Sequence, residues 1–234
     1  MVALGKSSRR EDLAVLPRGF YDRDPLEVAP DLLGKVLVSH VGPSRRSARI
    51  VEVEAYRGDE DPASHAFRGR TRRNAVMFGP PGHLYVYFTY GMHFCANVVC
   101  WPEGRAGAVL LRAAEPLEGI EAMRRARAAA RTDRDLASGP AKLCQAFGFD
   151  RSYDGMDLVP SWLGAAGQGI YENPEGPSME EQGDANASSP RALWMLNDGW
   201  VAPYGLSRGV RIGVSRGAEL EWRWWVTGDL NVSR

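Results

Sequence analysis

The sequence has few of the features that mark secreted or membrane proteins. It contains three cysteines in 234 residues, Cys95, Cys100 and Cys144, and no two of them have CxxC spacing. Such a sparse and odd set indicates reduced thiols in an intracellular, cytoplasmic protein rather than a disulfide framework. The sequence also shows no signal or transit peptide and no apolar run of about 18 residues. These absences predict a protein without membrane association.

Lysine is equally scarce, so arginine supplies nearly all the positive charge. Lys6, Lys35 and Lys142 are the lysines of the chain, and the formal net charge is zero. A neutral total is unusual for a protein that binds a polyanion, because contacts to phosphate groups require a basic surface. Arginine itself, however, suits bidentate contact with phosphate.

The charges are unevenly distributed along the chain. One basic cluster comprises Arg68, Arg70, Arg72 and Arg73. A second basic cluster comprises Arg124, Arg125, Arg127, Arg131 and Arg134. Acidic residues gather elsewhere, at Glu172, Glu175, Glu180, Glu181 and Asp184. A neutral protein can therefore present a basic face to a polyanion.

The apolar patterns predict an α+β fold. At 44% apolar residues the chain can build one sizeable core. Strands are predicted at 35–41, 48–56, 83–89, 94–100, 108–114 and within 209–226, and the third and fourth should form a hairpin. Helices are predicted at 25–33, 117–130 and 138–147, with Asp24 and Ser138 as N-caps and a helix or turn opening at 70–76. We expect a single mixed domain with a curved, mostly antiparallel sheet, flanking helices and a protruding β-hairpin.

Two segments are predicted to lie outside this regular structure. Residues 1–17 should form a flexible N-terminal arm, which leaves 18–234 as the single domain. Within that domain, residues 164–202 are rich in Gly, Glu, Ser and Asn with weak periodicity. We predict a long loop or an insertion there.

Two glutamates and a tyrosine form a candidate acid–base site. Glu52, Glu54 and Tyr56 are two residues apart on a predicted strand, so they share one face of the sheet. A carboxylate pair beside a phenol can carry proton transfer. The alternative is a solvated sheet face, which for a bare ExE pattern is the more common explanation.

His65 follows in the stretch DPASHAF. It could position a water molecule, donate a hydrogen bond to a ligand or bind a metal, or it could simply be a surface or satisfied histidine. Metal binding would need Glu54, His65 and either His83 or His93, which lack HxxxH and HExxH spacing. We therefore predict no metal site and no cofactor.

Tyrosines follow on the predicted hairpin. Tyr85 and Tyr87 alternate on one face, which is usual for ordinary packing, or they could stack on a base. Tyr90 falls at the turn, where it could wedge between base pairs.

Two further polar residues lie in apolar strands. Asn97 and Arg112 could satisfy neighbouring groups, as an isolated asparagine or ion-paired arginine usually does. Alternatively, Asn97 could read a base, and Arg112 could orient Glu54 or contact a sugar or phosphate.

Taken together, these residues resemble the alkyladenine (3-methyladenine) DNA glycosylase family. The matching stretches run in the family's order and cover most of the chain, at 31–38, 50–58, 61–78, 82–99, 107–119, 138–149 and 211–214. Two positions depart from the family pattern, His93 in place of an aromatic residue and Ser215-Arg216 in place of Gly-His.

The resemblance implies a monofunctional glycosylase that flips an alkylated or deaminated purine from duplex DNA and hydrolyses its N-glycosidic bond. It assigns Glu54 as the general base, with Arg112 beside it and the DNA. The residues expected around the base are Tyr56, His65, Tyr85, Tyr87, Asn97 and Val214, and Tyr90 is expected to intercalate. Contacts with the DNA backbone are expected from Arg70, Arg73, Met92 and Lys142.

The partner implied is double-stranded DNA that contains damaged purines, bound by a monomer. The location would be the bacterial nucleoid region, or the nucleus of a eukaryote. Two other functions are compatible with parts of the sequence. A non-catalytic nucleic-acid module explains the arginines and tyrosines, and a sugar hydrolase explains Glu52 and Glu54.

Overall fold

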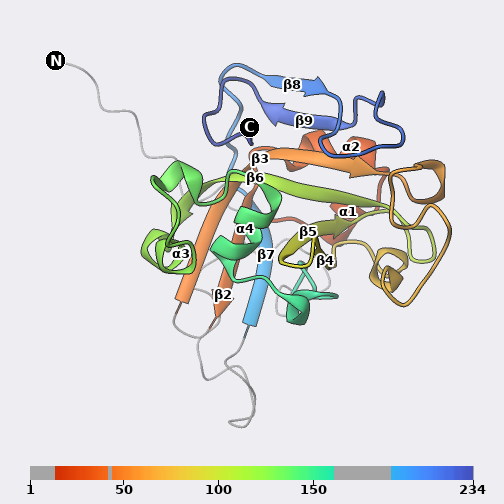
Figure 1. The fold of residues 1–234 in the computed structure, drawn as a ribbon, viewed down its shortest axis with the longest axis horizontal. Coiled ribbons are helices and arrows are strands. Elements are labelled where there is room, and N and C mark those ends of the chain that lie inside the picture. The colour runs from red at the N-terminus through yellow and green to blue at the C-terminus, as the bar shows by residue number, and fades with distance from the viewer. Residues whose placement is uncertain (1–13, 42–43, 161–190, 234) are drawn as a thin grey trace, which may run out of the picture.

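One antiparallel sheet organises the molecule. The computed structural model describes residues 14–41, 44–160 and 191–233. In these residues nine strands form a single sheet, and all the pairings are antiparallel (Figure 1). The order is β1 (Ala14–Val15), β7 (Arg191–Asn197), β2 (Val36–Val41), β3 (Ser44–Tyr56), β6 (Ala108–Glu118), β5 (His93–Val99) and β4 (Leu84–Thr89). The predicted α+β single domain is confirmed.

The long strand β3 joins the two halves of the sheet. Its first residues pair with β2, and Glu52–Glu54 pair with β9 (Arg223–Val226), which in turn pairs with β8 (Leu206–Gly209). Bulges interrupt the pairing of β3 with β6 on both sides of Glu52. A bulge bends a strand and increases its twist, so β3 can leave β2 and reach β9 along the same edge. This bend brings the last part of the chain beside Glu52 and Glu54.

Short helices cover the sheet. They are α1 (Arg18–Tyr21), α2 (Pro25–Leu32), α3 (Ile120–Ala126) and α4 (Pro140–Phe147). The main core is formed by apolar residues of the central strands together with α2 and α4. The predicted cap of α2 is confirmed, because the Asp24 carboxylate accepts a hydrogen bond from the Leu26 amide at 2.9 Å and Pro25 occupies the first turn.

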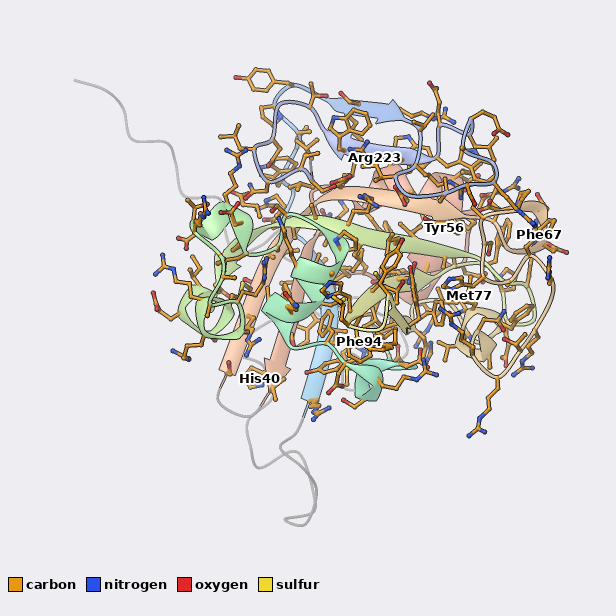
Figure 2. All side chains as sticks on the ribbon, in the orientation of Figure 1. His40, Tyr56, Phe67, Met77, Phe94 and Arg223 are labelled. Carbon is orange, nitrogen blue, oxygen red and sulfur yellow. The ribbon has the colours of Figure 1, made fainter. Side chains whose placement is uncertain are left out.

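The loops between these elements carry short 3-10 helices. These are η2 (Gly58–Glu60), η3 (Ala75–Phe78), η4 (Asp133–Asp135) and η5 (Arg151–Tyr153). The long connection from β3 to β4 contains the first two, and a small separate core that includes Ala66, Met77 and Tyr85 lies beneath it. Figure 2 shows Phe67 at the outer edge of this connection, where its side chain is partly exposed.

Several predicted elements differ from the structure. The strand β6 continues to Glu118 because it stays paired with β3, so α3 begins later and ends earlier than the predicted helix 117–130. Gly139, not Ser138, is the N-cap of α4 and makes no side-chain cap. Within the predicted insertion, Arg191–Asn197 form β7, which lies between β1 and β2.

The largest error concerns residues 210–214, which were expected to continue a strand. They form an irregular connection between β8 and β9 instead. At the other end of the chain, Ala14 and Val15 of the predicted arm form β1. Residues 1–13 and 161–190, with the acidic group at 172–184, lie outside the described part of the chain.

Candidate active site

Glu54 lies at the centre of the site. Its side chain is fully buried on β3, so the alternative of a solvated sheet face is wrong. The Tyr56 hydroxyl donates to Oε2 at 2.8 Å, and the backbone amide of Ile212 donates to Oε1 at 2.8 Å. Arg112 Nη1 lies 3.1 Å from the same Oε1. Donors on three sides therefore fix the orientation of this carboxylate.

Burial and charge keep these partners in the protonation states that the contacts require. Burial, and then the negative charge of Glu54, raises the pKa of the Tyr56 phenol, so it remains a hydrogen-bond donor. Burial alone would lower the pKa of Arg112, but Glu54 and Glu52 together raise it. Arg112 is therefore a permanent cation beside Glu54.

The irregular connection after β8 supplies the amide that contacts Glu54. Arg211, the residue before Ile212, forms a fully buried bidentate ion pair with Asp61, at 2.6 and 2.9 Å. Its guanidinium also lies over the Tyr56 ring, 4.7 Å from the centroid. The ion pair joins this connection to the loop that leads into His65. As a strand, residues 210–214 could not pack around the end of β3 in this way.

Aromatic rings form the opposite wall. His65 packs edge-on against Tyr87 at 4.4 Å between centroids, and Tyr87 stacks on Tyr85 at 5.5 Å. His65 Nδ1 and the Tyr85 hydroxyl lie 3.0 Å apart. Burial, reinforced by the positive charge of Arg73, lowers the pKa of His65 and favours a neutral imidazole.

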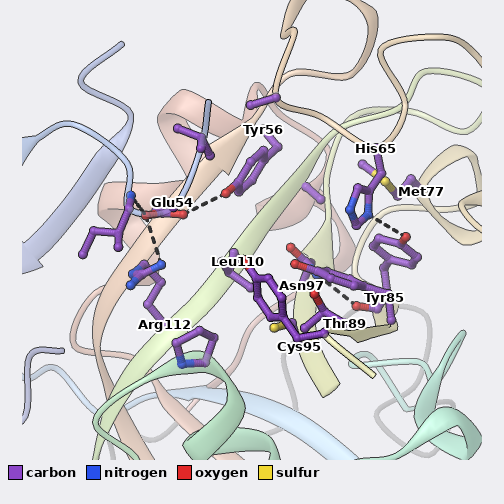
Figure 3. A pocket seen from close by; sticks show the side chains of 18 residues that line it. Glu54, Tyr56, His65, Met77, Tyr85, Thr89, Cys95, Asn97, Leu110 and Arg112 are labelled. Atoms are coloured by element: carbon purple, nitrogen blue, oxygen red, sulfur yellow. Dashed lines mark hydrogen bonds and ion pairs between the residues drawn. The ribbon is translucent and has the colours of Figure 1, made fainter. Parts of the chain in front are cut away.

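A cavity of about 240 Å³ lies between these two walls. Figure 3 shows Glu54, Tyr56 and Arg112 on one side and His65 and Tyr85 on the other. Every predicted catalytic, base-contacting and intercalating residue lines it, namely Glu54, Tyr56, His65, Tyr85, Tyr87, Tyr90, Asn97, Arg112 and Val214. Pockets for drug-sized ligands measure roughly 300–1,000 Å³, so this cavity suits a smaller flat molecule such as a nucleobase.

The hairpin of β4 and β5 ends at the mouth of the cavity. Tyr90 is 82% exposed and Met92 is 68% exposed. Tyr90 also has a φ of 51°, a left-handed conformation that is rare for a bulky residue and that occurs where a turn or a function requires it. The predicted hairpin is confirmed, and its tip offers two unpacked apolar side chains.

The residues predicted to contact the DNA backbone lie outside the cavity. Arg70 is exposed, and Arg73 extends over the Tyr87 ring, 5.8 Å from its centroid. Lys142 donates to the Ser138 hydroxyl at 3.2 Å and lines a neighbouring groove with Arg131 and Arg134. Pro140, two residues from Lys142, lines the main cavity, so the groove and the cavity are adjacent.

Several residues of the site were missed in the sequence. The contact from the Ile212 amide could not be predicted from the sequence, because every residue except proline has a backbone N–H group. Asn74 donates through its side chain to the His65 carbonyl at 2.8 Å and the Gly69 carbonyl at 3.0 Å, and so holds the loop that presents His65. In the sequence, the one usable signal was an uncharged asparagine directly after the arginines of the basic cluster at 68–73. Further side chains of the lining that were not predicted are Met77, Thr89, Cys95 and Leu110.

Among the described residues, no group of three or more His, Cys, Asp or Glu side chains could hold a metal ion. Over the same part of the chain, no helix is long and apolar enough to cross a membrane.

The fold and the site define an enzyme class. A buried carboxylate faces a ring-sized cavity, and an exposed aromatic hairpin stands beside it; this combination fits a hydrolase that acts on an unstacked base. The chain belongs to the methylpurine-DNA glycosylase (MPG) family, whose sequence profile matches residues 19–230. It is therefore a DNA glycosylase, a hydrolase of N-glycosyl bonds in DNA repair. Family membership excludes the non-catalytic module and the sugar hydrolase.

Relatives from several organisms are similar over nearly their whole length. A protein of Burkholderia lata is 48% identical over 220 residues, which cover 94% of this chain and 91% of the relative. A protein of Streptomyces avermitilis is 47% identical, covering 95% and 92%, and one of Carboxydothermus hydrogenoformans is 41% identical, covering 94% and 99%. Each of the three is provisionally named a 3-methyladenine DNA glycosylase.

Proposed function

We propose that this chain, acting as a monomer, extrudes an alkylated or deaminated purine from duplex DNA and hydrolyses its N-glycosidic bond. The observation that carries the proposal is Glu54. Its carboxylate is held by three donors in the wall of a cavity that is otherwise lined by aromatic rings. The base would enter this cavity, with its sugar directed toward the carboxylate.

Extrusion comes first, because a stacked base cannot reach an enclosed catalytic group. Damaged bases pair and stack less well, so they cost less to extrude. The extruded base would lie between Tyr56 on one side and His65 with Tyr87 on the other. Tyr90, at the mouth of the cavity, would fill the space left in the duplex.

Glu54 then activates the attacking water. A carboxylate has about four lone-pair positions, and the three donors occupy two on Oε1 and one on Oε2. The remaining position on Oε2 is where Glu54 would hold and deprotonate a water. Because the side chain is shielded from solvent, a small displacement of Tyr56 or of the segment after Arg211 would admit that water. As the base departs, C1′ becomes oxocarbenium-like, a charge that a nearby carboxylate stabilises.

The leaving group and the pocket together select the substrate. A cationic base such as 3-methyladenine departs readily, whereas neutral hypoxanthine needs protonation as well. Asn97 is buried in the lining, and its amide nitrogen donates to the Tyr85 carbonyl at 3.2 Å. This bond fixes the side chain where it can exclude normal purines with an exocyclic amino group.

The proposed product is an intact abasic site. A lyase step needs an amine nucleophile, and the described residues contain two lysines. Lys35 is bonded to Asn197 at 2.9 Å, and Lys142 lines the neighbouring groove. Neither lines the main cavity. Incubation with lesion DNA and borohydride should therefore trap no covalent adduct, and trapping one would overturn this part of the proposal.

The central test is Glu54→Gln. The amide keeps the shape of the side chain but cannot accept a proton, so base release should stop while lesion binding persists. Released bases would be measured by chromatography from methylated DNA and from duplexes with a single hypoxanthine or ethenoadenine. Glu103→Gln, on an exposed turn, is the matched control and should behave as wild type. Near-normal excision by Glu54→Gln would show that the assignment is wrong.

A further inference from the structure

Glu52 lies two residues before Glu54, on the same face of β3, and shares Arg112 with it but none of its other hydrogen-bond partners. Its side chain is fully buried. Arg112 Nε donates to Oε1 at 2.8 Å, and Arg223 Nε, from β9, donates to the same oxygen at 2.7 Å (Figure 2 labels Arg223). The Ser233 amide donates to Oε2 at 2.7 Å. Glu52 does not line the cavity, so it is not a second acid–base group.

Arg112 is held at all three of its nitrogens. Nε donates to Glu52, Nη1 pairs with Glu54 at 3.1 Å, and Nη2 donates to the Ser233 hydroxyl at 3.2 Å. Ser233 therefore contributes twice, through its amide to Glu52 and through its hydroxyl to Arg112. We propose that Glu52 and Ser233 are positioning residues that hold the Arg112 guanidinium on Oε1 of Glu54. This inference rests on the proposed role of Glu54 as general base.

The position of Arg112 matters because Glu54 has one acceptor position left. If the guanidinium could rotate, a free N–H could approach Oε2 and compete for the position proposed for the water. With Nε and Nη2 bound elsewhere, Arg112 reaches Glu54 through Nη1 alone. Fixed donors of this kind require no reorganisation during the reaction.

The same contacts distribute the buried charges around Glu54. Two buried carboxylates, Glu52 and Glu54, share Arg112, while Arg223 pairs with Glu52. Burial alone would raise the pKa of Glu52, but Arg112 and the hydrogen bonds from Ser233 lower it, so this residue stays ionised. The charge of Arg112 is thus shared between two carboxylates and is not directed at Glu54 alone.

Ser233 lies beyond the segment matched by the family profile, which ends at residue 230. The segment after β9 thus completes the set of contacts around the Arg112 guanidinium. The sequence pattern of the family did not assign this role.

The test compares single-turnover rates with DNA binding in the full-length protein. In Ser233→Ala, one hydrogen bond to a charged group is lost, so base release should slow about ten-fold. In Glu52→Gln, Arg112 loses its main anchor, and displacement of a catalytic group can cost about 100-fold. In both variants the reaction amplitude and the Kd for lesion DNA should remain those of wild type. Ser207→Ala, which removes the hydroxyl contact between Ser207 on β8 and Thr227, is the control.

A double-mutant cycle shows whether Ser233 acts through Arg112. In an Arg112→Gln background, Ser233→Ala should have no further effect on the rate, because its partner is already gone. An undiminished effect in that background would overturn the proposal. So would wild-type rates in both Ser233→Ala and Glu52→Gln while Glu54→Gln is inactive. If Glu52→Gln does not fold, Ser233→Ala and the cycle decide the question. Activity of Glu54→Gln would instead refute the proposed function itself.

Discussion

The ion pair between Asp61 and Arg211 should stabilise both the fold and the active site, and Asp61→Asn tests both. Each side chain is fully buried, and both oxygens of Asp61 are used by Arg211, at 2.6 and 2.9 Å. An asparagine provides one acceptor and directs its NH₂ group toward another donor. The variant therefore leaves a buried guanidinium without its counter-charge.

The size of the effect can be bounded from the contacts that remain. Breaking a buried ion pair by removing one partner typically costs about 3–5 kcal/mol. Arg211 keeps hydrogen bonds to the Ala55 carbonyl at 3.1 Å and the Gly217 carbonyl at 3.3 Å, and keeps its place over the Tyr56 and Trp222 rings. Because these contacts remain, we expect the loss of unfolding free energy to lie at the lower end of this range, about 3 kcal/mol. Domains are stable by about 5–15 kcal/mol, so the variant should still fold.

Urea unfolding followed by tryptophan fluorescence measures the loss of unfolding free energy. Glu60→Gln is the matched control, because Glu60 lies next to Asp61 but pairs with Arg57 and Arg105 at the surface. Such exposed pairs contribute about 0–1 kcal/mol. Asp61→Asn should also slow base release, since Arg211 positions the Ile212 amide on Glu54. A loss below about 1 kcal/mol with an unchanged rate would refute this account of the 210–214 segment.

Three other predictions concern the cavity and its surroundings. Arg73→Gln should raise the pKa of His65, because the charge of Arg73 contributes to lowering it. More of the His65 imidazole would then be protonated at about pH 6, so the ratio of the excision rates of cationic 7-methylguanine and neutral hypoxanthine should fall more between about pH 8 and about pH 6 than in wild type. Identical pH profiles of this ratio would contradict the prediction. Tyr90→Ala should weaken binding to lesion duplexes by about 1–3 kcal/mol, with little change for single-stranded lesion DNA, as titrations of both would show. Replacing Arg131 and Arg134 by glutamine should lower the slope of log Kd against log salt by about 2, and an unchanged slope would exclude phosphate contacts there.

The sequence predicted those elements whose structure depends on residues close together in the chain. The hairpin of β4 and β5 followed from two runs of strand-forming residues around Tyr90-Gly91-Met92, and α2 followed from the Asp24 cap with Pro25. The predicted end of β6 and the predicted start of α3 were wrong, because pairing with β3, which is distant in sequence, extends β6 to Glu118. The strand β7 was missed because its place in the sheet, between β1 and β2, depends on pairing with strands distant in sequence, which no local pattern reveals.

Many of the residues that line the cavity could be proposed from the sequence for two reasons. The period of a strand places Glu52 and Glu54 on one face, and Arg112 contacts both. The resemblance then distributed roles among residues that are far apart in sequence. The strand period alone could not separate the two glutamates, because it places both on the same face; only the resemblance singled out Glu54. The structure separates them, because Glu54 lines the cavity and Glu52 faces Arg223 and Ser233.

What the sequence concealed is the contribution of the segment after β8. The alternation of residues 210–214 resembles that of a strand, and hydrophobic periodicity alone cannot show that Arg211 is needed elsewhere, on Asp61. Once that pair forms, the backbone turns and the Ile212 amide meets Glu54, while further along the chain Ser233 reaches Glu52. Both contacts use backbone N–H groups, which carry no side-chain signature. The orientation of Glu54, the proposed general base, therefore depends on how residues 210–233 pack around the end of β3.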